Sequence, residues 1–212
     1  GPPGTGKSLA AEVLAGPLGV DLLAVDISRV VSKWIGETEK NLAAVFDAAE
    51  RAQAVLLFDE ADALFGKRTE VSDAHDRYAN LETAYLLARL ERFEGLAVLS
   101  TNLRQNIDAA FLRRLEFVVD FEEPGPAERE AIWRCHIPSG APLAPEVDLR
   151  ELAALYPVVG GLIRNAAVAA AFLAAAEKTS ISRRHLVRAI RREYEKAGKT
   201  FPGAPAGMRT TP

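Results

Sequence analysis

An octapeptide at the start of the sequence has the spacing of a phosphate-binding loop. Residues 1–8 read GPPGTGKS, which fits the pattern of glycine, four residues, glycine, lysine and then serine or threonine. Glycines let the backbone approach phosphates and direct its N–H groups at them, Lys7 supplies positive charge, and the Ser8 hydroxyl is a possible Mg²⁺ ligand. We therefore predict that nucleotide is bound by Gly1, Pro2, Pro3, Gly4, Thr5, Gly6, Lys7, Ser8 and Leu9.

Two adjacent carboxylates follow a hydrophobic run further along the chain. The segment VLLFDEAD, residues 55–62, places Asp59 and Glu60 at the carboxyl end of a predicted strand, the edge of a parallel sheet where ligands bind. We predict that Asp59 binds Mg²⁺ and that Glu60 accepts the proton of the attacking water. By itself, a strand that ends in acidic residues leads into a solvated loop about as often as into a catalytic site. The phosphate loop earlier in this chain favours the catalytic interpretation.

The elements that must position these groups alternate between strand and helix patterns. Between short apolar runs, residues such as Leu42, Val45, Phe46 and Ala49 recur at helical spacing. Alternation of this kind predicts an α/β fold with a parallel sheet. Strands are expected at residues 22–26, 55–59, 96–101 and 117–121.

Strand patterns end at the Pro-Gly-Pro of residues 124–126. We therefore predict an αβα nucleotide-binding domain at residues 1–123, a small all-helical lid domain at 124–199 and a disordered tail at 200–212, where proline and glycine are frequent. The helices of the second domain are expected at residues 127–136, 148–156, 161–177 and 182–197.

The composition of the chain limits the partners and the cellular compartment that we expect for it. A net charge of −3 gives no general attraction to nucleic acid, so a nucleic-acid partner is not indicated. The single Cys135 excludes an internal disulfide, and the spacing of the three histidines fits no zinc site, so a reducing cytoplasm is favoured. The longest apolar run, residues 166–176, is shorter than the roughly 20 residues that span a bilayer, and no membrane partner is predicted.

Five segments, in this order, resemble the AAA+ ATPase superfamily and within it the AAA clade proper. The resemblance implies a three-layer αβα sandwich with a helical lid, ATP and Mg²⁺ as ligands, and a ring, expected to be a homo-hexamer, that remodels, unfolds or translocates protein substrates. Residues 160–175 are also similar to a bacterial subgroup that includes ATPases of contractile injection systems. The five segments are GPPGTGKS, SKWIGETEKNL at 32–42, LLFDEAD at 56–62, STN at 100–102 and IDAAFLRRLEF at 107–117.

The resemblance implies further site residues. Asn102 falls at the family's first sensor, which orients the attacking water, and Arg113 matches an arginine that reaches the γ phosphate of the next subunit, with Arg114 as a neighbouring candidate. The family has a second arginine three residues later, where this chain has Glu116. A carboxylate beside a triphosphate repels it, so an ATP-binding assembly module with weak hydrolysis is one alternative function.

A substrate-contacting loop is also implied. Trp34 and Ile35, before Gly36, match the family's first pore loop, in which large apolar side chains grip an extended polypeptide. The alternative is that Trp34 packs at a seam between domains. Residues 67–77 fall at the second pore loop, although a charge run of this kind is equally a solvated loop. A DNA-directed loader, the other alternative function, would favour basic residues at 33–36.

In the family the phosphate loop follows a central strand of the sheet, whereas this sequence starts at the loop's first glycine. We therefore expect the strands at 96–101 and 117–121 to flank an empty slot about 10 Å wide, twice the usual strand spacing. This is the expectation for a fragment of a longer protein.

Overall fold

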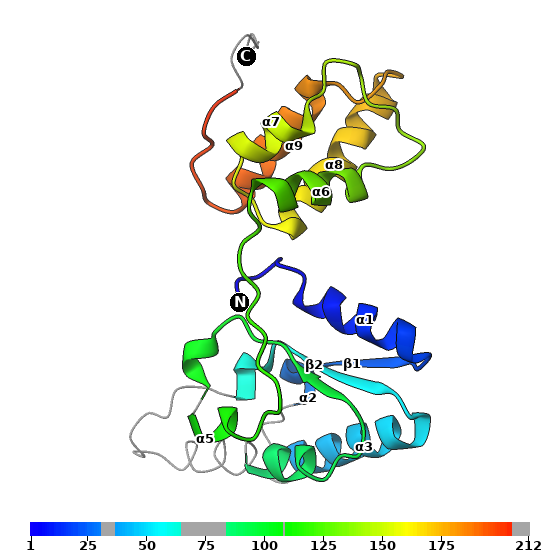
Figure 1. Ribbon diagram of the computed structural model, residues 1–212, viewed down its shortest axis with the longest axis vertical. Helices are drawn as coiled ribbons and strands as arrows, with labels where there is room; N and C mark the ends of the chain where they lie inside the picture. Colours follow the sequence, from blue (N-terminus) through cyan, green and yellow to red (C-terminus); the bar gives the residue numbers. More distant parts are fainter. Residues whose placement is uncertain (31–36, 65–83, 108, 205–212) are drawn as a thin grey trace. The chain divides into compact units, whose positions relative to one another are not determined.

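The computed structural model describes residues 1–30, 37–64, 84–107 and 109–204 (Figure 1). The described chain forms two compact units. Unit 1 comprises residues 1–2 and 6–121, and unit 2 comprises residues 3–5 and the chain from residue 122 onward. Within the described ranges, no helix has the length and apolar character needed to cross a membrane.

Unit 1 is built on a parallel sheet of three strands in the order β1-β2-β3. The strands are β1 (Leu22–Asp26), β2 (Val55–Asp59) and β3 (Ala97–Leu99). Asp26 pairs with Asp59, and Phe58 pairs with Leu99. The central strand β2 is apolar and buried from Val55 to Phe58, as a strand covered on both faces requires. Three of the four predicted strands are thereby confirmed, the third in a shorter form.

Helices cover both faces of this sheet, as Figure 1 shows for α1 on one side and α3 on the other. Leu42, Phe46 and Ala49 of α3 pack against Leu56 and Phe58 of β2 in one buried cluster. The three layers confirm the predicted αβα class. The helices are α1 (Lys7–Leu18), α2 (Ile27–Val30), α3 (Glu37–Ala52), a helix at residues 84–90 and α5 (Ala109–Leu112), with single 3₁₀ turns η1 (Ala61–Leu64) and η2 (Arg104–Asn106).

The strand predicted at residues 117–121 is wrong. The structure has no strand there, and Phe117, Val118 and Val119 are 83%, 47% and 71% exposed. An apolar β-branched run forms a strand only when a neighbouring backbone completes its hydrogen bonds, and no described strand lies beside it. The sequence pattern shows that this segment favours a strand, but it does not show whether a neighbouring strand is there to pair with it.

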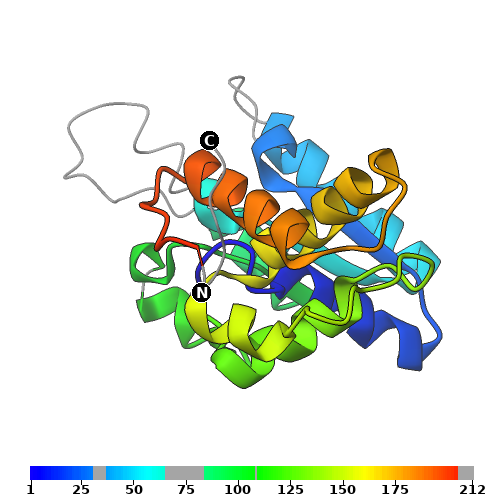
Figure 2. The same ribbon diagram turned by 90° about the horizontal axis from the view of Figure 1, so that it is seen from above.

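Unit 2 is a bundle of four helices around a single core. They are α6 (Pro126–His136), α7 (Leu149–Leu155), α8 (Gly160–Ala176) and α9 (Arg183–Lys196), each within two residues of the predicted bounds. In Figure 2, α9, drawn in orange to red, runs beside the yellow α8. Trp133, Tyr156 and Ile163 are fully buried between the helices. Asp148 caps α7 by accepting hydrogen bonds from the N–H groups of Arg150 and Glu151.

The start of the predicted tail packs on this bundle. The Phe201 ring stacks on Tyr156 with 5.5 Å between centroids, and the Tyr156 hydroxyl donates a 2.8 Å hydrogen bond to the Gly203 carbonyl oxygen. These two contacts join residues 201–203 to the aromatic core of the bundle. Residues 205–212 lie outside the described residues.

Candidate nucleotide-binding site

The phosphate loop leads directly into the amino terminus of α1. Gly6 precedes the helix with φ of 100°, and Gly4 has φ of 77°. At Gly6 a side chain would have open space around it, so it is the backbone conformation that requires glycine. Because the first N–H groups of a helix have no partner within it, the start of α1 at Lys7 is a natural place for an anion.

The Lys7 ammonium contacts the first two residues of the phosphate loop and the turn after β3. Its Nζ donates hydrogen bonds to the carbonyl oxygens of Gly1 at 2.8 Å and Pro2 at 2.7 Å, and to Asn102 Oδ1 at 2.8 Å. Burial lowers the pKa of Lys7, against the opposing effect of the negative charges of Asp59 and Asp62. All three hydrogen-bond partners are uncharged oxygens, so a phosphate competes well for this ammonium.

Asp59, at the end of β2, has both carboxylate oxygens engaged. Oδ2 accepts a 2.8 Å hydrogen bond from the Ser8 hydroxyl, and Oδ1 accepts from the Ser100 hydroxyl and, at 3.1 Å, from the Glu60 N–H. Burial by itself would raise the pKa of Asp59, but these hydrogen bonds and the charge of Lys7 outweigh it and lower the pKa. Asp59 is therefore a carboxylate at neutral pH.

The oxygens of Ser8 and Asp59 suit a magnesium ion. A hydroxyl and an ionised carboxylate, 2.8 Å apart, are the hard oxygen ligands that Mg²⁺ prefers, and Mg²⁺ completes its shell with water and phosphate oxygens. No group of three or more His, Cys, Asp or Glu residues that could hold a metal occurs in the described parts of the chain.

Glu60 is held in an uncommon backbone conformation. Its φ is 53°, in the left-handed region that residues other than glycine seldom adopt. Such conformations persist only where the surrounding structure enforces them, and they are concentrated at functional sites. Glu60 is exposed, so water can reach it at the carboxyl edge of the sheet.

The turn after β3 brings a second set of polar groups to this edge. Asn102 contacts Lys7, Ser100 contacts Asp59, and the Thr101 hydroxyl donates to the Asp62 carboxylate. The sequence patterns predict a role for Asn102 but not for Ser100 or Asp62. The available signals were the hydroxyl residues in STN and the second acid in LLFDEAD.

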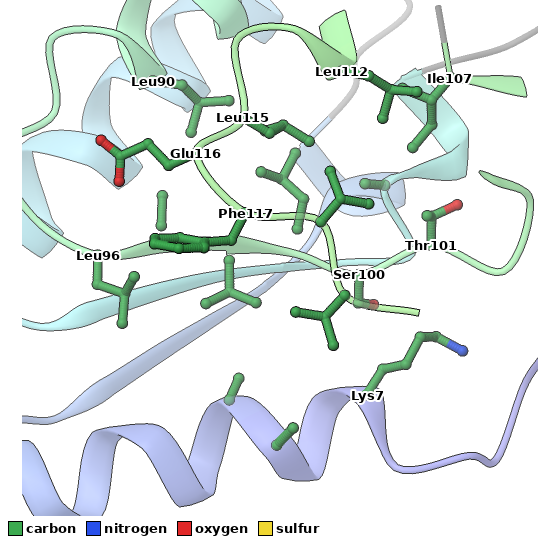
Figure 3. A pocket seen from close by; sticks show the side chains of 18 of the residues that line it. Lys7, Leu90, Leu96, Ser100, Thr101, Ile107, Leu112, Leu115, Glu116 and Phe117 are labelled. Atoms are coloured by element: carbon green, nitrogen blue, oxygen red, sulfur yellow. The ribbon is translucent and has the colours of Figure 1, made fainter. Parts of the chain in front are cut away.

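A cavity of about 960 Å³ lies in unit 1 between α1, β3 and residues 115–121. Its walls are mainly apolar, and Figure 3 shows Leu96 and Phe117 among the side chains that line it, with Lys7 near Ser100 at one end. At that end the Gly1 amino group is 3.4 Å from the Thr101 carbonyl oxygen, and a Cβ on Gly1 would clash with the Phe121 carbonyl oxygen. The strand β3 borders the cavity on one side, and residues 115–121 border it without forming a strand.

Comparison with known families agrees with this geometry. Residues 1–123 match the family described as ATPase family associated with various cellular activities (AAA). The chain belongs to the AAA family. The match covers more than half of its 212 residues and confirms the resemblance inferred from the five sequence segments.

Individual relatives of this AAA domain cover most of its length. It is 36% identical over 160 residues to the Cell division cycle protein 48 homolog of Archaeoglobus fulgidus, covering 72% of this chain and 21% of that protein. It is 35% identical over 162 residues to the Proteasome-activating nucleotidase of Aeropyrum pernix, with 73% and 39% covered. It is 34% identical over 202 residues to the ATP-dependent zinc metalloprotease FtsH 1 of Sphaerobacter thermophilus, with 91% and 31% covered. The chain thus spans well under half of each of these relatives.

Of the remaining predicted site residues, those that follow α5 are described by the structure. Arg113 is exposed just after α5. Arg114 pairs with Glu91 at 2.7 Å, and Glu116 lines the α1–β3 cavity (Figure 3). Trp34, Ile35 and the second pore-loop segment, 67–77, fall outside the described residues.

Proposed function

We propose that this AAA domain binds ATP with Mg²⁺ and hydrolyses its terminal phosphoanhydride bond. The observation that carries the proposal is the meeting of four predicted residues from separate parts of the chain. Ser8 lies 2.8 Å from Asp59, and Lys7 lies 2.8 Å from Asn102. Lys7 and Ser8 of the phosphate loop, the carboxylate proposed to bind the metal and the amide proposed as a sensor thus lie at one edge of the sheet.

Each residue has a distinct task in this proposal. Lys7 exchanges its carbonyl partners for the β and γ phosphates, and Ser8 and Asp59 hold the Mg²⁺ ion that neutralises phosphate charge. Asn102 orients the attacking water with its side-chain amide. Glu60 accepts the proton of that water, and Arg113 contributes positive charge to the γ phosphate of a neighbouring subunit.

Removing the Lys7 charge tests nucleotide binding. Lys7→Ala is expected to weaken MgATP binding about tenfold to a hundredfold, because a hydrogen bond to a charged group is worth about 1.5–3 kcal/mol. Calorimetric titration with a non-hydrolysable ATP analogue measures the change. Lys40→Ala, which removes an exposed lysine of α3, is the matched control and should bind as the parent does. Equal affinity of parent and Lys7→Ala would contradict the assigned site.

At the level of the assembly, we propose a homo-hexameric ring in the cytoplasm that remodels or translocates protein substrates. The proposal is supported by the similarity to a Proteasome-activating nucleotidase, by the exposure of Arg113, and by a single cysteine, which fits a reducing compartment. We also propose that residues 124–199 serve as the lid domain and Trp34 and Ile35 as the pore loop.

Replacing the pore-loop tryptophan separates substrate handling from hydrolysis. Trp34→Ala is expected to keep ATP turnover within about twofold of the parent while abolishing ATP-dependent unfolding of a tagged fluorescent protein, because it removes the large apolar contact area that grips the polypeptide. Thermal unfolding of the variant checks its integrity. Loss of folding together with both activities would instead indicate that Trp34 is a core residue.

A weakly hydrolysing assembly module is the second candidate, and Glu116 is the observation that favours it. Its carboxylate replaces the second arginine of the family, so a ring of these chains lacks one positive charge at each subunit boundary. Turnover measured in the assembled ring distinguishes the candidates. A rate no higher than that of the isolated subunit would favour the assembly module.

A further inference from the structure

The backbone connection between β2 and β3 continues beyond the strands. The Ser100 N–H donates to the Phe58 carbonyl oxygen, and the Ala61 N–H donates to the Ser100 carbonyl oxygen, both at 2.9 Å. After this point the chain that follows β2 turns into η1, so its backbone no longer runs beside residues 101–103. The N–H groups of those residues need another acceptor.

The side chain of Asp62, in η1, takes over this role. Its Oδ2 accepts a 3.2 Å hydrogen bond from the Asn102 N–H, and its Oδ1 accepts one of 3.2 Å from the Leu103 N–H. Oδ1 also accepts from the Thr101 hydroxyl, which in turn accepts a 3.0 Å bond from the Leu103 N–H. One carboxylate thus receives donors from three consecutive residues.

This clamp fixes the residue that carries the sensor side chain. In the structure Asn102 is held at two points, at its N–H by Asp62 and at its Oδ1 by Lys7. In the proposed function Lys7 moves to the phosphates when ATP binds. The hydrogen bonds to Asp62 are then the ones that keep the Asn102 amide aimed at the attacking water.

We propose that Asp62 is a positioning residue for ATP hydrolysis, which acts by clamping the 101–103 turn that carries Asn102. The inference rests on the proposed function and adds a residue to it. A carboxylate is needed because both of its oxygens accept, whereas the NH₂ group of an asparagine would face an N–H donor. An N–H donor that is left without an acceptor lowers the stability of a partly buried site.

A double-mutant cycle with Asn102 tests the inference. Asp62→Ala and Asp62→Asn are each expected to lower kcat about tenfold to a hundredfold with KM within about threefold, because the loss falls on the hydrolytic step. If Asp62 acts through Asn102, the double variant with Asp62→Ala and Asn102→Ala should be no slower than Asn102→Ala alone. Asp47→Ala, which removes a half-exposed carboxylate paired with Arg89, is the matched control and should keep the parent rate.

Two results would overturn the inference. In one, the effects of Asp62→Ala and Asn102→Ala multiply in the double variant, which means that they act independently. In the other, Asp62→Ala raises KM with kcat unchanged, which means that it acts on nucleotide binding through the charge near Lys7. Should Asp62→Ala fail to fold, Thr101→Val removes one of the clamp's donors at similar volume. It should lower kcat by a smaller factor, again without effect in an Asn102→Ala background.

Amide hydrogen exchange tests the clamp without reference to turnover. The Asn102 and Leu103 amides should exchange at least about tenfold faster in Asp62→Ala than in the parent or in Asp47→Ala, because exchange follows the loss of their hydrogen bonds. Unchanged exchange would contradict the clamp itself. A parent chain that shows this protection but never hydrolyses ATP would contradict the proposed function instead, so the two failures are distinguishable.

Discussion

Glu60→Gln is expected to bind MgATP with the affinity of the parent while its turnover falls at least about a hundredfold, since a positioned general base contributes about 10²–10⁴ in rate. The amide has the shape of the carboxylate but cannot accept a proton from water. Glu60 is exposed and its N–H, which the change leaves in place, is the group that contacts Asp59. The substitution therefore removes the base and spares the metal site.

Titration with a labelled nucleotide and an assay of phosphate release measure the two effects separately. Glu50→Gln, an exposed position on α3, makes the same chemical change away from the site and should hydrolyse ATP as the parent does. Parent turnover in Glu60→Gln would refute the assignment of the base. Mixing Glu60→Gln with Arg113→Ala subunits extends the experiment, because partial recovery of activity is expected only if Arg113 acts across a subunit boundary.

A short apolar strand joined ahead of Gly1 is expected to stabilise unit 1 by a few kcal/mol. For each residue that is both buried and hydrogen-bonded, about 1.5–3 kcal/mol from burial and about 1 kcal/mol from the hydrogen bond outweigh about 1–2 kcal/mol of lost conformational entropy. The cavity beside β3 offers the room, and Gly1 lies at its end between Thr101 and Phe121. Five residues, the length of β1 and β2, would extend along β3.

Two changes within unit 1 would contribute to this gain in stability. The added strand would pair with the open edge of β3 and cover apolar side chains that are now exposed, among them Val13, Leu14, Leu96, Phe117 and Val119. It would also give residues 117–121 a neighbour with which to form the strand that their sequence favours.

Urea denaturation of unit 1 measures the gain in stability. The urea concentration at the midpoint of unfolding should be higher for the apolar extension than for a Gly-Ser extension of equal length. Slower amide exchange at residues 117–121 should accompany it. Equal midpoints for the two extensions would show that the cavity does not accept a strand.

The sequence by itself determined the parts of the site that depend on local chemistry. The spacing of Gly1, Gly6, Lys7 and Ser8 predicts phosphate binding because the loop conformation and the helix that follows it are set within a few residues. The hydrophobic run before Asp59 predicts a buried strand. Since parallel strands end at one edge of the sheet, it follows that Asp59 and Asn102 meet the phosphate loop there.

Tertiary structure alone decided the contacts between groups that are distant in the sequence. Asp62 meets its donors 39–41 residues further on, and Ser100 meets Asp59 across 41 residues, so no local pattern specifies these hydrogen bonds. The same reason explains the wrong strand prediction at residues 117–121. These residues have strand-forming side chains, but no strand in the described part of the chain lies beside them, whereas Phe201, in a segment rich in proline and glycine, packs on an aromatic core. A hydrogen bond or a buried ring needs two participants, and a local sequence pattern describes only one of them.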